Sequence, residues 1–264
     1  MTTLFVAGVG CWAPGLEGWA TARAVLRGQT PYASRAVAVP APERLPANER
    51  RRATISVRLA FRVAEDALAG TDLAADALAT VFASSDGDTP IVDRVCRALC
   101  DRLPSVSPTD FHNSVHNAAA GYWSIATGAR GPSVSLSSGD SSFASGLLEA
   151  MGIAIVEDRD CLLVAFDVSP PPPLRGPCRI GEPAAVSLLL TQRRRPGSLA
   201  SLRISMVSPE LETPMRDAAL ETLRRTTPPA RALPLLAMLA CEAAGSVRLQ
   251  GAGGRTVALE IGTF

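Results

Sequence analysis

The sequence contains no lysine, so every basic side chain among its 264 residues apart from the two histidines is an arginine. Chemistry that needs a lysine amine, such as Schiff-base formation or the lysine of a phosphate-binding loop, is therefore excluded. The two histidines, His112 and His116, both precede a serine-rich segment at residues 134–145. No histidine follows those serines to complete a triad in the order that α/β hydrolases use.

The chain also has little net charge and lacks long apolar runs. The 26 basic and 25 acidic residues leave a formal charge of +1, so no strong field attracts nucleic acid or an acidic membrane. No apolar stretch approaches the roughly 18 residues of a membrane span, and no secretory apolar segment is evident. We expect a cytoplasmic protein with neither a nucleic acid nor a membrane as partner.

The cysteines do not indicate a disulfide framework. Six are scattered along the chain, at positions 11, 96, 100, 161, 178 and 241, which is typical of reduced thiols rather than disulfides. Cys96 and Cys100 stand four residues apart within 91–103, where Val92, Val95 and Leu99 recur at helical spacing. We interpret both thiols as small residues on or near a buried helix face, and we expect no metal site.

Short apolar runs alternate with amphipathic segments. We expect strands over 4–10, 78–88, 132–138, 161–166 and 184–190, and helices over 17–28, 54–70, 91–103, 116–130 and 141–156. Glycines close the first strand as a tight turn, Thr54 caps the second helix, and the proline-rich segment 169–183 is a spacer. A strand at 202–207, helices at 213–225 and 230–244, and a hairpin at 246–261 follow. This alternation predicts an α/β fold, and we treat residues 1–264 as one domain.

Residues 134–145, VSLSSGDSSFAS, predict a strand that turns sharply into a helix. Free amides at a helix N-terminus can activate a nucleophile there, and a cysteine benefits most. Asp140 at this elbow is a poor nucleophile, and we interpret it as an N-cap of the helix. An alternative stays open, namely an independent acyl-transfer or hydrolytic enzyme that uses the serines around Asp140, since triads are defined by geometry rather than by order.

Several segments resemble the β-ketoacyl synthase family. ARGPSVSLSSGDSSFASGLLEA (129–150) is similar to the nucleophile region of these enzymes, and their acyl-accepting cysteine falls on Asp140. FHNSVHNAAAGYWSIATGARG (111–131) is similar to the segment beside the acyl tunnel and the dimer interface. LFVAGVGCWAPG (4–15) and IGEPAAVSLLLTQ (180–192) are similar to the first strand and to a later strand of the same family.

The resemblance implies a thiolase-like layered αβαβα fold. Residues 1–190 would form the synthase-like N-terminal half, and residues 191–264 an abbreviated C-terminal half. The combination of NSVHNAAAGYWSIATG with a short chain resembles the small chain-length factors of aryl polyene and xanthomonadin-type pathways. These are type II polyketide systems, related to fatty acid biosynthesis.

The chain also departs from the family. Active members use the cysteine with two histidines from the second half of the chain, usually accompanied by a lysine, and none of these groups is present. We therefore expect no catalytic residue and no cofactor in this chain. The resemblance then implies a non-catalytic subunit that pairs with a catalytic ketosynthase as a heterodimer and shapes its acyl tunnel, while an acyl carrier protein docks mainly through that partner.

The same resemblance suggests which side chains would approach the partner's acyl pocket. Six residues of segment 111–127 are candidates: Phe111, His112, Val115, His116, Tyr122 and Trp123. The alternative is a helix packed inside its own domain, where the small residues 118–121 allow close approach. The arginine runs 50–52 and 193–195 could receive an acidic carrier protein by complementary charge, but we favour a solvated surface as the explanation of each.

Overall fold

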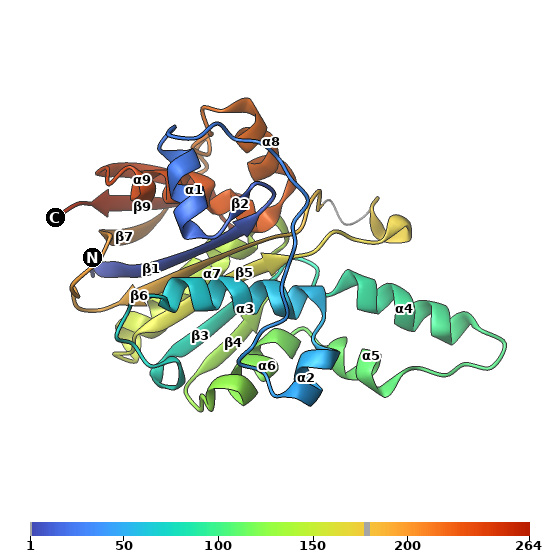
Figure 1. Cartoon of the computed structure of the whole chain (residues 1–264). Helices are drawn as coiled ribbons and strands as arrows, with labels where there is room; N and C mark the ends of the chain where they lie inside the picture. The colour runs from blue at the N-terminus through green and yellow to red at the C-terminus, as the bar shows by residue number, and fades with distance from the viewer. Residues whose placement is uncertain (1, 177–179) are drawn as a thin grey trace.

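The computed structural model describes residues 2–176 and 180–264, which form an α/β fold around a single connected sheet (Figure 1). Its strands are β1 (Leu4–Ala13), β2 (Leu16–Glu17), β3 (Ala79–Ala83), β4 (Ser133–Leu136), β5 (Cys161–Asp167), β6 (Ala184–Thr191), β7 (Ala200–Val207), β8 (Gly245–Gln250) and β9 (Thr256–Gly262). The strand order is β4-β3-β5-β6-β1-β7-β9-β8, with β2 paired to the end of β1.

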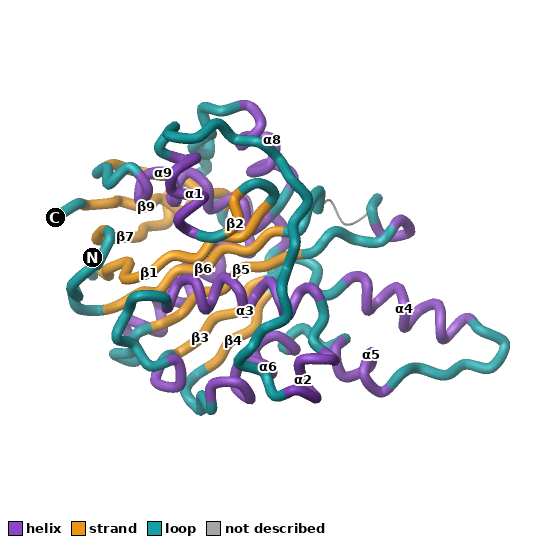
Figure 2. Tube along the Cα trace, in the orientation of Figure 1, coloured by secondary structure: helices purple, strands orange, loops and turns teal. Residues whose placement is uncertain are grey.

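Helices cover both faces of this sheet (Figure 2). They are α1 (Trp19–Leu26), α2 (Ala47–Arg52), α3 (Ile55–Leu68), α4 (Thr89–Cys100), α5 (Pro108–Asn113), α6 (Ala118–Thr127), α7 (Ser142–Val156), α8 (Ala218–Thr226) and α9 (Leu233–Ala240). Short 3₁₀ turns are η1 (Ala75–Ala77), η2 (Gly139–Ser141), η3 (Pro172–Leu174), η4 (Pro228–Ala232) and η5 (Ala252–Gly254).

The sheet is parallel only where β3 lies between β4 and β5. From β5 onward each strand runs antiparallel to its neighbour, through β6, β1, β7, β9 and β8. The C-terminal strands therefore join the sheet of the N-terminal part directly, through the pairing of β7 with β1. The predicted α/β fold class is confirmed, and the C-terminal strands extend the sheet of the N-terminal part.

Alternation along the central strands divides the core between two faces. Leu162, Val164 and Phe166 of β5 pack with α3 and α6, while Leu163 and Ala165 face α7. The second face also receives apolar side chains from α1, α8 and α9. A near-continuous run of apolar residues is thus buried on both sides, which explains why β5 lacks polar alternation.

The glycines near the start of the chain correct one prediction. They do not end a strand at a tight turn but lie within β1, which continues to Ala13. A Cβ atom at Gly8 would stand 1.9 Å from the Ala67 carbonyl oxygen, and one at Gly10 would stand 2.1 Å from that of Val63. These glycines allow the backbone of α3 to approach the sheet closely.

Two further expectations on helices had different outcomes. Thr54 caps α3 as predicted, because its hydroxyl accepts a hydrogen bond from the Val57 amide at 3.4 Å. The prediction for Cys96 and Cys100 was wrong, because both thiols are exposed on α4. Only the first turn of α4 is buried, since the helix projects away from the sheet (Figure 1). The five described cysteines are free thiols, and Cys178 lies outside the described residues.

Candidate functional site

The predicted strand-to-helix elbow is present between β4 and α7. β4 runs parallel to β3 at the edge of the sheet, and the turn η2 follows, with Gly139 at a φ of +53°. The Ser142 hydroxyl accepts a hydrogen bond from the Ser138 amide at 2.9 Å and donates one to the Gly139 carbonyl oxygen at 2.8 Å. Ser142 is buried and thus holds the elbow together from inside.

Asp140 does not cap α7, so that part of our interpretation was wrong. The helix begins at Ser142, and within residues 2–176 and 180–264 no backbone amide donates to the Asp140 carboxylate. Because η2 places Asp140 ahead of the cap position, its half-exposed side chain turns outward to Arg231. The Nη2 atom of Arg231 lies 3.4 Å from the Asp140 Oδ2 atom.

Arg231 belongs to a chain of ion pairs that ties the elbow to the C-terminal part. Its Nη1 atom lies 3.1 Å from a Glu212 oxygen, and the same carboxylate also pairs with the buried Arg224. Arg224 in turn makes two bonds to Glu221, at 2.7 and 2.8 Å. This bidentate pairing lowers the pKa of Glu221 to about 2.

A buried carboxylate beneath the elbow was missed by the sequence analysis. Asp167 ends β5, and its Oδ1 atom accepts hydrogen bonds from the Ser84 hydroxyl and the Ser85 amide, both at 2.8 Å. Burial is the main cause that raises the pKa of Asp167 to about 7. Its Oδ2 atom has no hydrogen-bond partner within the described part of the chain.

Asp167 is connected to the elbow through one further hydrogen bond. The Ser137 hydroxyl, just after β4, donates to the Ser85 carbonyl oxygen at 2.6 Å. The carboxyl ends of β3, β4 and β5 therefore meet in one polar cluster, as expected for neighbouring parallel strands. The sequence contained a signal for this polar cluster, since Ser84 directly follows the apolar strand β3 and Asp167 ends the apolar strand β5.

The elbow serines are not arranged for nucleophilic catalysis. Ser141 and Ser142 are buried, and in the described ranges no histidine or carboxylate forms a hydrogen bond with Ser138, Ser141 or Ser142. His116 bonds instead through Nε2 to the Leu136 carbonyl oxygen, at 2.9 Å. A nucleophile and a base within hydrogen-bond reach are the minimum that such chemistry requires.

The structure separates the six residues predicted to approach an acyl pocket into two groups. Phe111, His112, Val115 and His116 are exposed, on α5 and in the turn that leads to α6. Tyr122 and Trp123 are each only 1% exposed and pack in the core beside α3, where the Trp123 ring meets that of Phe61 at 5.2 Å. Their burial corresponds to the alternative of ordinary packing within the chain.

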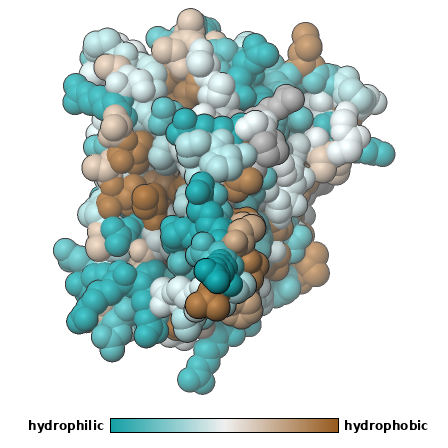
Figure 3. Space-filling model, turned by 90° about the vertical axis from the view of Figure 1, so that its right-hand side faces the viewer, coloured by the Kyte–Doolittle hydropathy of each residue, from teal (hydrophilic) through white to brown (hydrophobic). Residues whose placement is uncertain are grey.

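α4 and α5 form an arm that projects from the body of the molecule (Figure 1). Apolar side chains along the arm and the adjoining α6 are exposed, and Leu103 at the tip is 85% exposed. Figure 3 views the molecule from the side to which the arm projects, and brown hydrophobic side chains border the protruding part. We call this set the arm surface: Val92, Leu99, Leu103, Phe111, Val115 and Ile125.

The fold can now be assigned to a family. Residues 19–242, most of the chain, match the profile of the family described as beta-ketoacyl synthase, N-terminal domain. The chain therefore belongs to this family, and its fold is the thiolase-like fold of ketosynthases. A search of curated proteins gave no match.

Solved structures with the same fold include complexes of ketosynthases. One is the ketosynthase ApeO in complex with its chain length factor ApeC from Xenorhabdus doucetiae, with a TM-score of 0.73 and 24% identity over 98% of this chain and 100% of that chain. The ishigamide ketosynthase/chain length factor gives 0.77 and 13% identity over 99% of each chain. A β-ketoacyl synthase from Burkholderia phymatum gives 0.69 and 14% identity, with full coverage of both chains.

Two searches for other kinds of site found nothing in the described residues. No described helix combines the length and the apolar character needed to cross a bilayer. Groups of three or more histidine, cysteine, aspartate or glutamate side chains placed to hold a metal ion are also absent from residues 2–176 and 180–264.

Proposed function

We propose that this chain is a non-catalytic, chain-length-factor-like subunit of a type II polyketide or aryl polyene system. It pairs as a heterodimer with a catalytic ketosynthase and shapes the acyl tunnel of that partner, which also does most of the docking of the acyl carrier protein. The observation that carries this proposal is the arm surface, whose apolar side chains are exposed next to the free edge of the sheet at β4.

Exposed apolar side chains near an open sheet edge are typical of a protein interface. β4 pairs on one side with β3 and has no second neighbour among the described strands, so its outward backbone groups are available. Half of the large apolar side chains that are strongly exposed belong to the arm surface. Exposed patches of this kind are rare on monomers and common where a partner binds.

The elbow supports the absence of a nucleophile in this subunit. An aspartate stands where the family holds its cysteine, and Arg231 pairs with it. The similar structures that are complexes of a ketosynthase with a chain length factor agree with the proposed pairing. Localisation in the cytoplasm follows from the proposed pathway.

The pairing is tested by co-expression with a type II ketosynthase from the same organism, followed by size-exclusion chromatography. L99S/L103S should abolish the complex, whereas L211S should leave it intact. Leu211 is the matched control, because it is 92% exposed and lies outside the arm surface. A complex that survives L99S/L103S would contradict the proposed interface.

The role in chain length needs a separate measurement on the intact complex. Replacing Phe111, His112, Val115 or His116 by alanine should lengthen the product or broaden its distribution, as measured by mass spectrometry of the released chains. Unchanged product lengths in all four variants would contradict this role.

The serine-based alternative is tested on the chain alone. Incubation with acyl and malonyl carrier protein should yield neither a covalent adduct nor hydrolysis, and either outcome would favour that alternative.

A further inference from the structure

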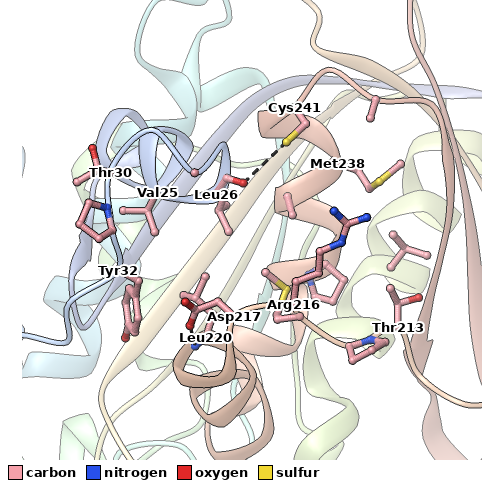
Figure 4. A pocket seen from close by; sticks show the side chains of 18 of the residues that line it. Val25, Leu26, Thr30, Tyr32, Thr213, Arg216, Asp217, Leu220, Met238 and Cys241 are labelled. Atoms are coloured by element: carbon pink, nitrogen blue, oxygen red, sulfur yellow. Dashed lines mark hydrogen bonds between the residues drawn. The ribbon is translucent and has the colours of Figure 1, made fainter.

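A cavity of about 590 Å³ lies between α1, α8, α9 and β8. Figure 4 shows it from close by, with α1 on one side and α9 on the other. None of its lining residues belongs to the elbow or to the arm surface. Its volume falls in the range of roughly 300–1,000 Å³ that is typical of small-molecule sites.

The walls of this cavity are predominantly apolar. Side chains from four elements and one connecting segment converge on it: Val25, Leu26, Met215, Leu220, Met238 and Val247. Two of these are methionines, whose flexible thioethers adapt to ligands of irregular shape. The lining therefore favours an aliphatic group.

One cationic group stands over this apolar space. The Arg216 side chain extends across the cavity toward Met238 (Figure 4). Within the described ranges its guanidinium forms neither a hydrogen bond nor an ion pair, in contrast to Arg224 and Arg231 nearby.

Two other polar side chains that line the cavity, Asp217 and Tyr32, are already engaged. The Asp217 carboxylate accepts hydrogen bonds from the amides of Ala219 and Leu220, at 2.8 and 2.9 Å, and so caps α8. The Tyr32 hydroxyl donates to the Pro14 carbonyl oxygen at 2.9 Å. Arg216 is thus the charged group at the mouth that is available to a ligand.

We propose that this cavity binds a linear aliphatic chain that ends in a carboxylate, as a free long-chain carboxylate rather than as part of a protein or a membrane. The chain fills the apolar space among α1, α8 and α9, and the carboxylate accepts hydrogen bonds from Arg216. A guanidinium binds a carboxylate with two parallel donors, which gives the site its preference for an acid over an alcohol or an amine of the same length. The site is independent of the proposed pairing with a ketosynthase.

Dodecanoate is a suitable probe, titrated into the full chain by isothermal titration calorimetry. We expect saturable binding at one site, and dodecyltrimethylammonium should bind much more weakly. R216Q should raise the Kd roughly fivefold, because the lost charge pair is partly exposed. R130Q, which changes an exposed arginine outside the cavity, should leave the Kd unchanged. Absence of binding, or equal binding of both amphiphiles, would overturn the proposal.

The position of the bound ligand is tested independently by thiol alkylation. Cys241 lines the cavity and is exposed, whereas Cys96 is exposed on the arm and serves as an internal control. Dodecanoate should slow alkylation of Cys241 and leave that of Cys96 unchanged, as measured by peptide mass spectrometry. The A237W variant should abolish binding by filling the cavity. Equal protection of both thiols, or unchanged binding in a folded A237W chain, would place the ligand elsewhere.

Discussion

The elbow and the arm surface lie at the same end of the sheet, but they are built in opposite ways. At the elbow several polar groups are engaged within the chain, by Ser142, by the Asp140–Arg231 pair and by the hydrogen bonds to Asp167 Oδ1. On the arm, side chains such as Leu99, Leu103 and Phe111 are exposed to solvent. The elbow, to which the family resemblance assigns the nucleophile, is held by internal contacts, whereas the apolar side chains of the arm surface are exposed.

This difference indicates what each region contributes. Contacts made within the chain stabilise the isolated fold, so changes at the elbow should appear in the free energy of unfolding. Exposed apolar side chains contribute little to that free energy and become important only when a partner buries them. The predictions below use unfolding of the isolated chain to test this contrast.

The largest expected effect is a pH dependence caused by Asp167. Its pKa is raised to about 7 in the folded state, so between about pH 4 and pH 7 the folded state holds a proton that the unfolded state has lost. This group therefore makes stability fall as pH rises through that range, by at most about 1.4 kcal/mol per pH unit. D167N should remove this contribution, as measured by urea unfolding at several pH values.

The matched control for this experiment is D101N, because Asp101 is exposed at the end of α4. It should leave the slope of stability against pH unchanged. Glu221 acts in the opposite sense, because its lowered pKa contributes stability that is lost only as pH falls from about 4.5 toward about 2. Above about pH 5 the contribution of Glu221 is constant, and the difference in slope between D167N and the parent chain reports on Asp167. An equal slope in D167N and the parent chain would show that Asp167 does not titrate in this range.

The second prediction concerns Arg231, which joins the elbow to the C-terminal part. R231M removes the partner of Asp140 and one of two partners of the Glu212 carboxylate. Because Arg231 is largely buried, we expect a loss of about 2 kcal/mol in the free energy of unfolding. R225M is the control, since Arg225 is exposed on the adjacent helix. Equal effects of the two variants would show that the ion pairs do not stabilise the elbow.

A smaller effect is expected at Asp140, the position to which the family resemblance assigns the nucleophile. The Asp140 side chain is half exposed, so D140N should lower the free energy of unfolding by less than about 0.5 kcal/mol. D140C should likewise fold, and without the partner it should show no condensing activity, because the two family histidines are absent. Product formed by D140C alone in a malonyl carrier protein assay would contradict our account of the elbow.

The smallest effect is expected on the arm. L103S should change the free energy of unfolding by less than about 0.5 kcal/mol, because Leu103 is exposed in the isolated chain. The same measurement by urea unfolding applies. A loss as large as that of R231M would mean that the arm folds back onto the body in solution, and the contrast between the two regions would fail.

The sequence was sufficient to predict most of the sheet and the elbow, because the spacing of apolar residues and the residues typical of turns are local features. The elements around Thr54, β5 and α7 were found where expected. Gly8 and Gly10 were misread as a turn. They leave room for the backbone of α3, and the carbonyl groups that approach them belong to residues more than 50 positions later in the chain. The short helix α2 was missed because the prolines that precede it, at positions 40, 42 and 46, suggested a loop.

The site was harder to predict, because its contacts join distant parts of the chain. Asp140 was expected to serve its own helix, but its partner Arg231 lies 91 residues away. The apolar spacing in α4 correctly indicated a helix, yet it could not show that the apolar face projects beyond the body. The resemblance of segment 111–131 identified the right region without distinguishing the exposed Phe111 from the buried Trp123.

The position of β1 in the sheet has a consequence for biosynthesis. This strand comes near the beginning of the sequence, yet both of its long neighbours, β6 and β7, lie beyond residue 183. During translation β1 therefore leaves the ribosome long before either neighbour has been made. The sheet can close only after most of the chain has emerged, so the nascent protein exposes apolar strand edges for much of its synthesis.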